Sequence, residues 1–416
     1  MRWLRLCLRV ALLVSVTCGG AKRNDFYSKA VVLTVKNPIP LPRIDEPVLL
    51  DVRTIKEREP AFNPKAFVLL ADGKEVASQA NDLDADGQYE AIVAVLDFAP
   101  NAERALTLRY APSGVAERSY AKRSYAELSV KSGGRFIDRK YVGGQFINVR
   151  SLRVPPEHTD HSEFIRYEGP GWESDRIGYR FYLDWRNAID LFGKKVSHIV
   201  LPSVGQDGFN SYHQMAIWGM DILKVGESLG IGSVGMWLDG KAHRVSTTDS
   251  VLCEVVLDGP VQSLIRTKYF GWQVSGRSYD LVSELSIMAG SRITTHSLSA
   301  TGDPPNLCTG IVKDPSAGLF SATSWGGWAY LATYGKQSLA NDSLGMAIIF
   351  NQNDLIESTE DEHSHIVVLR PQNGRLVYHF LAAWQQEPGG IKTKEKFVRY
   401  LGETLQRLEQ PGAVSY

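Results

Sequence analysis

The stretch VLCEVVLDGPVQSLIRTKYF, residues 251–270, contains two apolar runs separated by Asp258, Gly259 and Pro260. Both runs are rich in β-branched and large apolar residues, which favour strands, whereas Asp, Gly and Pro favour tight turns. The stretch therefore predicts two antiparallel strands joined by a short connection.

The same pattern continues on both sides of this stretch, over residues 135–392. Turn signals such as Asp-Gly, Gly-Pro, Asn-Gly and Pro-Gly-Gly separate many of the apolar or alternating runs. The strands are too many for one small sandwich, and they predict a large domain built as a double-layered antiparallel sheet.

Residues 25–115 contain shorter runs, among them VVLTV, AFVLLA and ALTLRYA, bounded by Pro, Asn, Asp or Gly. This spacing is typical of a small, immunoglobulin-like β-sandwich. Residues 116–134 are more polar and are expected to form a linker with an approach strand. The predicted fold class is all-β.

Two segments are predicted to be helical, namely NAIDLFGKK (187–195) and EKFVRYLGETLQRLEQ (395–410). In the second, Phe397, Leu401, Leu405 and Leu408 recur at helical spacing, so we expect residues 393–416 to form a C-terminal helix and tail, with the helix packed on a sheet.

The charge balance makes nucleic acid an unexpected partner. Lys plus Arg and Asp plus Glu both number 46, which gives a formal charge of zero. A protein that binds a polyanion usually carries a basic excess.

Residues 1–21 read as a secretory signal peptide, because three arginines surround and precede an apolar run that ends in small residues. A periplasmic or secreted protein is expected. Lipid anchoring at Cys18 is the rival interpretation, although Ser15 and Thr17 make a poor lipoprotein box. No later segment reaches the roughly 18 apolar residues of a membrane span, so no transmembrane segment is expected.

Cys253 and Cys308 are the cysteines that remain after the leader. They could pair in an oxidising compartment, or they could be separate buried thiols. Their spacing does not suggest a zinc site.

The segment NDLDADGQYE, residues 81–90, places Asp82, Asp84 and Asp86 at alternate positions before Gly87. Such a pattern begins a calcium loop, but the twelfth position is Val93 where a bidentate Glu is needed, and only Glu90 could add a carboxylate. A structural Ca²⁺ and a polar turn both remain open. We expect no other cofactor.

The segment GYRFYLDWR, residues 178–186, alternates as a strand does. The period places Arg180, Tyr182, Asp184 and Arg186 on one face. An Arg can bind a carboxylate with its planar fork, and a Tyr can donate a proton or a hydrogen bond. The alternative is a solvated face with an Arg–Asp ion pair.

The segment 211–237 gathers polar and aromatic residues among glycines: Tyr212, His213, Trp218, Asp221 and Lys224. Histidine titrates near neutrality and can serve as a base, and Trp offers a platform for a sugar ring. Single histidines are nevertheless often structural.

Three further positions are weaker candidates for substrate contact: Glu173, His379 and Trp384. His379 alternates with apolar neighbours and could instead be a buried, hydrogen-bonded side chain. The loop PEHTDHSEF, with His158 and His161, could hold a metal, but its spacing fixes no third ligand.

The chain resembles a bacterial family known as a domain of unknown function, whose members accompany polysaccharide-degrading enzymes. The resemblance covers nearly all of the chain after the leader and rests on LDADGQYE, GPGWESDRIGYRFYLDWRNAIDLFGKK, YHQMAIWGMDILKVGESLGIGSVGMW, TGIVK and LATYGKQSLANDSLGMAIIF. It implies a β-sandwich followed by a galactose-mutarotase-like supersandwich, as in several polysaccharide lyases. The family offers no catalytic residues to carry over.

The residues favour an exported protein that acts on uronate-containing oligosaccharides by β-elimination. Arg180 or Arg186 would neutralise the substrate carboxylate, His213 or Tyr182 would be the base, and a tyrosine such as Tyr212 the acid. A mutarotase or isomerase is the alternative, with His213 paired with Asp221 or Glu173. A non-catalytic glycan binder is the third hypothesis. The partner would be an oligosaccharide or polysaccharide in each case, and the oligomeric state is left open.

Overall fold

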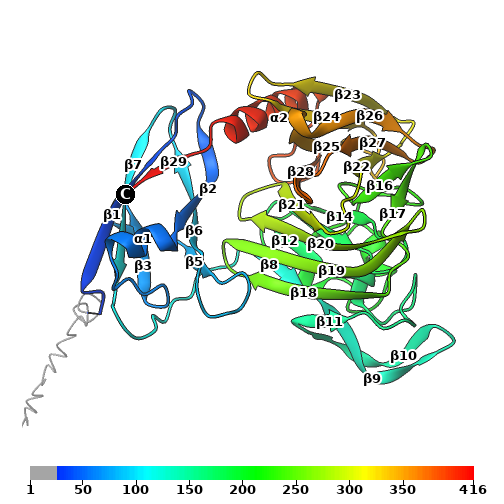
Figure 1. Ribbon diagram of the computed structural model, residues 1–416, viewed down its shortest axis with the longest axis horizontal. Coiled ribbons are helices and arrows are strands. Elements are labelled where there is room, and N and C mark those ends of the chain that lie inside the picture. The colour runs from blue at the N-terminus through cyan, green and yellow to red at the C-terminus, as the bar shows by residue number, and fades with distance from the viewer. Residues whose placement is uncertain (1–25) are drawn as a thin grey trace, which may run out of the picture.

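A computed structural model describes residues 26–416 of the chain. The predicted leader, residues 1–21, and the alternative anchor Cys18 lie outside the described residues. The described chain is an all-β protein, as predicted, with a small β-sandwich, a large multi-sheet domain and a helix near the C-terminus (Figure 1).

The N-terminal sandwich packs a five-stranded sheet, of order β29-β1-β7-β3-β4, against a three-stranded sheet, of order β2-β6-β5. The strands are β1 (Lys29–Lys36), β2 (Arg43–Asp51), β3 (Phe67–Ala71), β4 (Lys74–Glu75), β5 (Ser78–Asn81), β6 (Ala91–Phe98) and β7 (Glu103–Tyr110). The helix α1 (Val52–Arg58) follows β2, and the Asp51 carboxylate caps it by accepting a hydrogen bond from the Thr54 amide at 2.6 Å.

The last strand of this sandwich comes from the other end of the chain. β29 (Ala413–Ser415) pairs antiparallel with β1, with Thr34 opposite Ser415. The red C-terminal segment in Figure 1 returns to the blue N-terminal sheet for this reason. The expected tail is therefore an edge strand of the first domain.

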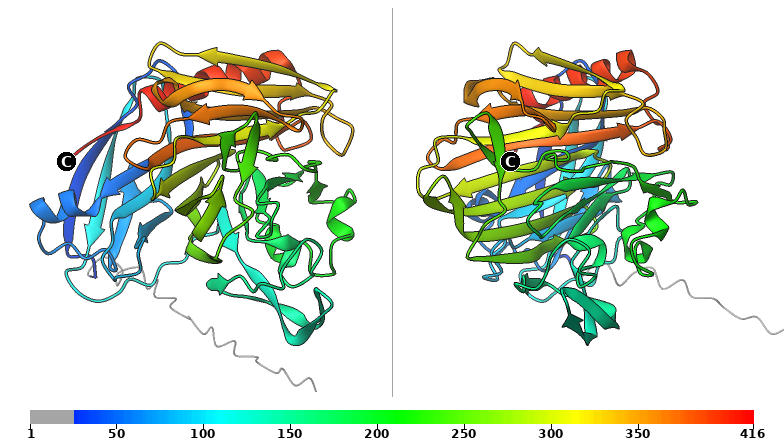
Figure 2. Two further views of the ribbon diagram at one scale, coloured as in Figure 1. Left: turned by 45° about the vertical axis from the view of Figure 1, so that its right-hand side comes forward. Right: turned by 90° about the vertical axis from the view of Figure 1, so that its right-hand side faces the viewer.

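In the large domain, a nine-stranded antiparallel sheet faces two five-stranded sheets across one core (Figure 2). The nine strands in order are β11 (Ser151–Arg153), β18 (Ser250–Asp258), β19 (Gln262–Val274), β20 (Arg277–Met288), β21 (Ile293–Ala300), β28 (Arg375–Trp384), β25 (Leu344–Asn351), β24 (Trp328–Gly335) and β23 (Ala317–Thr323). The predicted double-layered architecture is confirmed.

The two smaller sheets contribute the opposite layer. One consists of β15 (Gly219–Asp221), β14 (Ile189–Lys194), β13 (Ile177–Phe181), β12 (Gly171–Ser174) and β8 (Ser124–Glu127). The other consists of β17 (Lys241–Arg244), β16 (Gly235–Leu238), β22 (Leu307–Val312), β27 (Ser364–Leu369) and β26 (Leu355–Glu360). A separate hairpin of β9 (Ser129–Ile137) and β10 (Lys140–Asn148) projects from this domain (Figure 1).

The hairpin predicted from residues 251–270 is confirmed as β18 and β19. Ser250 lies opposite Phe270 and Asp258 opposite Ser263, with a register shift between Val255 and Leu257. Side chains at alternate positions of β19 are buried in the core between the layers, so the alternation seen in the sequence corresponds to the two faces of the sheet.

One prediction about local structure was wrong. Residues 187–195 contain the strand β14 instead of a helix, because β14 is hydrogen-bonded between β13 and β15 and is buried throughout. A short apolar run buried on both faces carries no period that separates strand from helix. Residues 116–134, expected to form a linker with an approach strand, contain β8, which starts at Ser124 and joins the sheet through β12.

The predicted C-terminal helix is α2 (Lys394–Glu409). Phe397, Leu401 and Leu405 are buried against β24, β25 and β28, and the Thr393 hydroxyl caps the helix by accepting from the Lys396 amide. α2 thus covers one end of the outer face of the nine-stranded sheet before the chain crosses to β29 (Figure 1).

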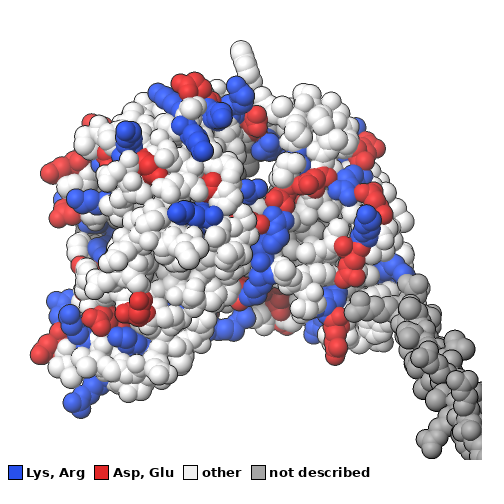
Figure 3. Space-filling view, turned by 180° about the vertical axis from the view of Figure 1, so that it is seen from behind, with Lys and Arg blue, Asp and Glu red and all other residues white. Residues whose placement is uncertain are grey.

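Cys253 and Cys308 are free, buried thiols, so they do not pair with each other. Burial raises the pKa of Cys253 to about 12. Within residues 26–416, no helix is long and apolar enough to cross a membrane. Seen from behind, basic and acidic side chains are both spread over the surface, in keeping with the formal charge of zero (Figure 3).

Candidate active site

Arg180 lies at the centre of a buried polar cluster in the sheet that contains β13 and β14. The two strands pair so that Arg180 lies opposite Asp190. The Asp190 Oδ2 atom accepts from Nε of Arg180 at 3.1 Å and from Nη2 at 2.7 Å. The two side chains are 3% and 1% exposed, so this is an ion pair inside the domain.

Two further groups complete the environment of the Arg180 guanidinium. The Asp221 Oδ2 atom, at the end of β15, lies 2.5 Å from Nη2 of Arg180, and the Tyr212 hydroxyl accepts from Nη1 at 2.9 Å. A buried guanidinium must have its charge and its donors satisfied. Arg180 therefore has no free face for a substrate carboxylate.

His213 connects this buried cluster to solvent. It lies on the 3₁₀-helix Ser211–His213, its side chain is 45% exposed, and its Nε2 atom is 3.4 Å from Oδ2 of Asp221. The hydrogen bond to Asp221 raises the pKa of His213 above its ordinary value. A carboxylate that is held by Arg180 thus orients an accessible imidazole, an arrangement suited to proton transfer.

Tyr182 also belongs to the cluster, through Asp190. Its hydroxyl donates to Oδ2 of Asp190, and both side chains are buried. Burial, together with the nearby carboxylate of Asp221, raises the pKa of Asp190 to about 6. Burial also raises the pKa of Tyr182 well above its ordinary value, so the phenol stays protonated at neutral pH.

Arg186 lies next to the same cluster, in the turn that follows β13. Its guanidinium is 4.0 Å from the centre of the Tyr182 ring. It pairs with Asp184, with Oε1 of Glu168 at 2.8 Å and with Oδ1 of Asp160 at 2.9 Å. Like Arg180, it is already neutralised by carboxylates.

Glu168 links the two arginines. Its Oε2 atom lies 3.9 Å from Nη1 of Arg180, and its Oε1 atom binds Arg186. Burial alone would raise its pKa, but the two guanidinium groups outweigh burial and lower the pKa of Glu168 to about 2. Arg180, Arg186 and their carboxylates form one ion network that reaches the surface at His213. Its members are Asp160, Glu168, Arg180, Asp184, Arg186, Asp190, His213 and Asp221.

His161 is a second exposed histidine at this network. Its side chain is 66% exposed, its Nδ1 atom is 2.5 Å from Oδ1 of Asp160, and its amide donates to Glu168 at 3.0 Å. The ring of Phe209 lies 5.3 Å from the His161 ring, and the Phe209 backbone hydrogen-bonds to His213. The sequence around His161 suggested only a metal ligand, because spacing along the chain gives no link to His213.

The loop with His158 and His161 can be tested as a metal site. Asp160, His161 and Glu168 bring ligand atoms within 4.8 Å of one another, but Arg186 already binds both carboxylates. His158 is buried and bonded to Ser162 at 2.8 Å, and burial lowers its pKa to about 4. The carboxylates that could bind a metal in this loop are therefore already neutralised by Arg186.

The structure places three predicted substrate contacts away from the ion network. Glu173 is fully buried, pairs with Lys194 and accepts from the backbone amides of Val200 and Leu201. Trp384 is 1% exposed and donates from Nε1 to Asp342 at 2.7 Å. Because these two side chains are buried in the protein and bonded internally, they cannot contact a substrate.

His379 is the third of these contacts. It is buried, bonded to Thr295 at 3.0 Å, and burial lowers its pKa to about 4. It lines a separate cavity of about 750 Å³ between β2, α2 and the outer face of the nine-stranded sheet. Of the remaining candidates, Trp218 is half-buried beside Phe192 at 6.0 Å, and Lys224 is exposed.

The acidic loop of the N-terminal sandwich brings together four carboxylates. Ligand oxygens of Asp82, Asp84, Asp86 and Glu90 all lie within 4.8 Å of one another. Hard carboxylate oxygens of this kind suit Ca²⁺. The loop also touches the large domain, because the carbonyl of Leu83 accepts from Nη2 of Arg266 at 3.0 Å.

Comparison with solved structures finds remote similarity. An alpha-mannosidase from Enterococcus faecalis V583 has 10% sequence identity and a TM-score of 0.47, and the match covers 93% of this chain and 46% of that one. A protein in the glycosyl hydrolase family 38 from Enterococcus faecalis has 8% identity and a TM-score of 0.42, with 94% and 48% covered. The chain thus spans about half the length of these proteins.

No curated protein sequence matches the chain. A family model described as "Domain of unknown function (DUF4861)" matches residues 35–414, which include both β domains and the whole ion network. The chain therefore belongs to the DUF4861 family.

Proposed function

We propose that the protein is a carbohydrate-active enzyme that catalyses proton transfer at a sugar, in the manner of an aldose mutarotase or isomerase. One observation carries the proposal: the accessible imidazole of His213 lies 3.4 Å from Asp221, which is itself held by the buried Arg180. A structural histidine needs no such support, whereas a general base must be held in position and must keep a suitable pKa.

A second histidine supports a reaction with an acid and a base. His161 bonds to Asp160 as His213 bonds to Asp221, and both histidines contact Phe209. In ring opening, one imidazole removes the proton of the anomeric hydroxyl while the other, as imidazolium, gives a proton to the ring oxygen. The bond between the anomeric carbon and the ring oxygen breaks, and an open-chain aldehyde forms. Closure on the other face reverses both proton transfers and returns the opposite anomer.

β-Elimination on a uronate is the second candidate, and the geometry supports it less well. That reaction needs a cation at the substrate carboxylate. Arg180 is enclosed by Asp190, Asp221 and Tyr212, and Arg186 already binds carboxylates. A non-catalytic binder would need neither a raised histidine pKa nor the buried ion pair behind it.

We place this activity outside the cytoplasm, on sugars released from polysaccharides. The composition of residues 1–21 supports the location outside the cytoplasm. The long motifs around residues 169–195 and 212–237 support the link to polysaccharides, because they resemble a family whose members accompany polysaccharide-degrading enzymes.

Saturation-transfer NMR on neutral hexoses and uronic acids tests the proposal. The wild-type chain should accelerate anomer exchange above buffer, and His213→Gln should reduce that acceleration by about 10²- to 10⁴-fold while the melting temperature stays the same. His363→Gln is the matched control, because His363, which directly precedes β27, is a similarly exposed histidine whose Nε2 atom lies 3.2 Å from the surface carboxylate of Glu227.

The pH profile separates a base from a structural histidine. Since Asp221 raises the pKa of His213, the acidic limb of the profile should lie above the ordinary histidine value. Absence of exchange with any sugar, together with an unsaturated product formed from a polyuronate, would reject the mutarotase proposal in favour of a lyase.

A further inference from the structure

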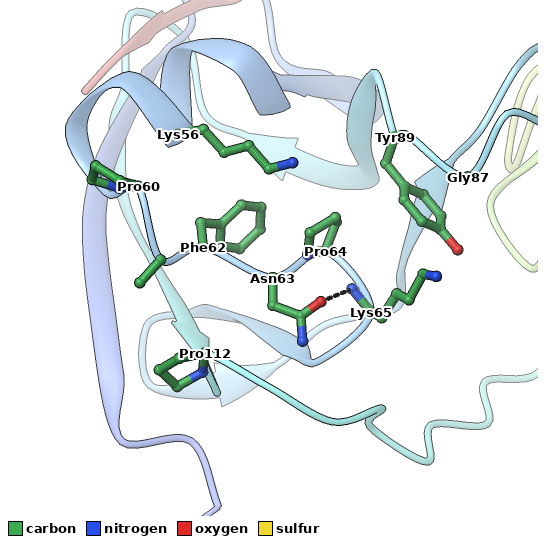
Figure 4. A pocket seen from close by; sticks show the side chains of 10 residues that line it. Lys56, Pro60, Phe62, Asn63, Pro64, Lys65, Gly87, Tyr89 and Pro112 are labelled. Atoms are coloured by element: carbon green, nitrogen blue, oxygen red, sulfur yellow. Dashed lines mark hydrogen bonds between the residues drawn. The ribbon is translucent and has the colours of Figure 1, made fainter.

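Two adjoining hollows on the N-terminal sandwich are lined by basic side chains and flat rings. The first has a volume of about 360 Å³ and lies between α1, the loop after it and Tyr89 (Figure 4). The second, of about 600 Å³, continues past Lys65 and Tyr89 along the segment that leads to the large domain. Because the hollows share Pro64, Lys65 and Tyr89, they form one surface, called here the basic groove.

The charge in the basic groove has one sign. Its cationic lining residues are Lys56, Lys65, Arg118 and Lys122, and neither hollow has an acidic lining residue. Lys122 pairs with Asp258 at 2.5 Å. Within residues 26–416, the other three have no carboxylate oxygen within 4.0 Å. The groove therefore presents cations whose charge the protein leaves uncompensated.

Arg118 is the most constrained of these cations. Its guanidinium carbon lies 3.7 Å from the centre of the Phe67 ring, which fixes the plane of the group. Its Nε atom is buried and has no hydrogen-bond partner, Nη1 makes a long contact of 3.5 Å with Ser78, and the guanidinium also interacts with the Tyr120 hydroxyl. The guanidinium as a whole is only half-buried, so an anionic ligand in the groove could accept from its Nη donors, which have no carboxylate partner in the described chain.

Apolar rings accompany the cations. Phe62 lies beneath Lys56, and the Lys65 ammonium is 6.0 Å from the centre of the Tyr89 ring (Figure 4). Tyr120 lines the second hollow, and its hydroxyl donates to Glu75 at 2.8 Å. Aromatic rings next to cations match a sugar that has an apolar ring face and a carboxylate.

The surroundings of the groove favour a ligand of moderate charge density. The acidic loop of Asp82, Asp84 and Asp86 directly precedes Gly87, which lines the first hollow. Its carboxylates are turned to their own loop, as when Asp82 accepts from the Gly87 amide at 3.0 Å. A nucleic acid or a heavily sulfated chain would be repelled there, whereas a chain with one carboxylate per sugar can stay on the lysine side.

We infer that the basic groove binds a carboxylate-bearing oligosaccharide, separately from the ion network of the large domain. This site would hold acidic glycans on the N-terminal sandwich, whichever reaction His213 catalyses. It also gives the uronate recognition expected from the sequence a different location, because Arg180 and Arg186 are already paired.

Calorimetric titration of the full chain with tetragalacturonate tests the inference, with the neutral galactose tetramer and a single-stranded oligonucleotide as comparison ligands. Lys56→Gln combined with Lys65→Gln should weaken tetragalacturonate binding by about 5- to 30-fold, since each exposed ionic contact contributes modestly. Added salt should weaken wild-type binding in the same direction.

Lys36→Gln is the matched control. Lys36 is an exposed lysine of β1 that lines neither hollow, and it pairs with Glu103 at 3.1 Å. This variant should bind as the wild type does. His213→Gln should also bind normally, so loss of catalysis and loss of binding are separable.

Three outcomes would overturn the inference: no binding of tetragalacturonate, equal binding of the neutral tetramer, or tighter binding of the oligonucleotide. Unchanged binding by the double lysine variant would move the site elsewhere on the protein and would also overturn it. Neither lysine is in the core of the sandwich, so folding of the variants can be verified by their melting temperatures.

Discussion

The ion network of the large domain and the basic groove of the N-terminal sandwich differ in whether carboxylates of the protein neutralise their cations. In the ion network, the two guanidinium groups Arg180 and Arg186 meet the carboxylates of Asp160, Glu168, Asp184, Asp190 and Asp221. In the basic groove, Lys56, Lys65 and Arg118 have no carboxylate partner among residues 26–416.

Burial explains this contrast. A charge inside the protein must be compensated, so Arg180 became a structural element that positions Asp221 and His213. An exposed charge at a surface groove, such as that of Lys65, stays hydrated and remains available to a ligand at little cost in free energy. An arginine in a polar segment therefore indicates an anion-binding site only when carboxylates of the protein do not already neutralise it.

Replacing Arg180 should have the largest effect on stability. Arg180→Met leaves Asp190 and Asp221 buried without their cation, and the free energy of unfolding should fall by about 3–5 kcal/mol. Denaturant unfolding measures this change. Arg375→Met is the control, because Arg375 is exposed at the start of β28, and it should change stability by less than about 0.5 kcal/mol. Equal effects would show that the buried pair has no special role.

The raised pKa of Asp190 predicts that the free energy of unfolding depends on pH. The expected change is somewhat smaller than the loss caused by Arg180→Met. Its folded-state pKa is raised to about 6, so the native state binds more protons than the unfolded state between about pH 4 and pH 6. The stability that this carboxyl contributes is therefore present below about pH 4 and lost as the pH rises through 6, by at most about 3 kcal/mol.

Asp190→Asn should remove this loss. The free energy of unfolding of the variant minus that of the wild type should therefore increase from pH 4 to pH 6. Unfolding curves across this range provide the measurement. Glu168 does not interfere, because its lowered pKa, about 2, places its own contribution above about pH 4 and its loss at lower pH. A constant difference between the two proteins would contradict the raised pKa.

Calcium binding by the acidic loop, which borders the basic groove, provides a third test of how the two regions differ. Four converging carboxylates that form no ion pair within the described part of the chain should bind the ion, and at 100 times its Kd calcium would stabilise the folded chain by about 2.7 kcal/mol. We expect the melting temperature to rise with added Ca²⁺ in the wild type and not in Asp84→Ala.

The same Asp84→Ala variant should keep the anomer exchange assigned to His213, because the loop belongs to the other domain. An unchanged melting temperature of the wild type in calcium would leave the loop as a polar turn. Loss of exchange in Asp84→Ala with unchanged stability would contradict the separation of the two regions.

Local sequence patterns determined most of the secondary structure. The alternation in residues 251–270 reflects which side chains of β18 and β19 face the core, and Phe397, Leu401 and Leu405 fix the buried face of α2 within a few turns. The closeness of Arg180, Tyr182 and Arg186 to one another was also foreseeable, since they lie within one short segment.

The roles of these residues follow from contacts between strands, which no single segment of the sequence specifies. The pairing of β13 with β14 put Asp190 opposite Arg180, and β15 brought Asp221 beside both, which turned a presumed anion site into a neutralised support for His213. Packing on both faces made residues 189–194 a strand, and the return of residues 413–415 to β1 completed the first sandwich. Each outcome depends on a partner distant in sequence and on exclusion of water, and neither is encoded in the spacing of a single segment.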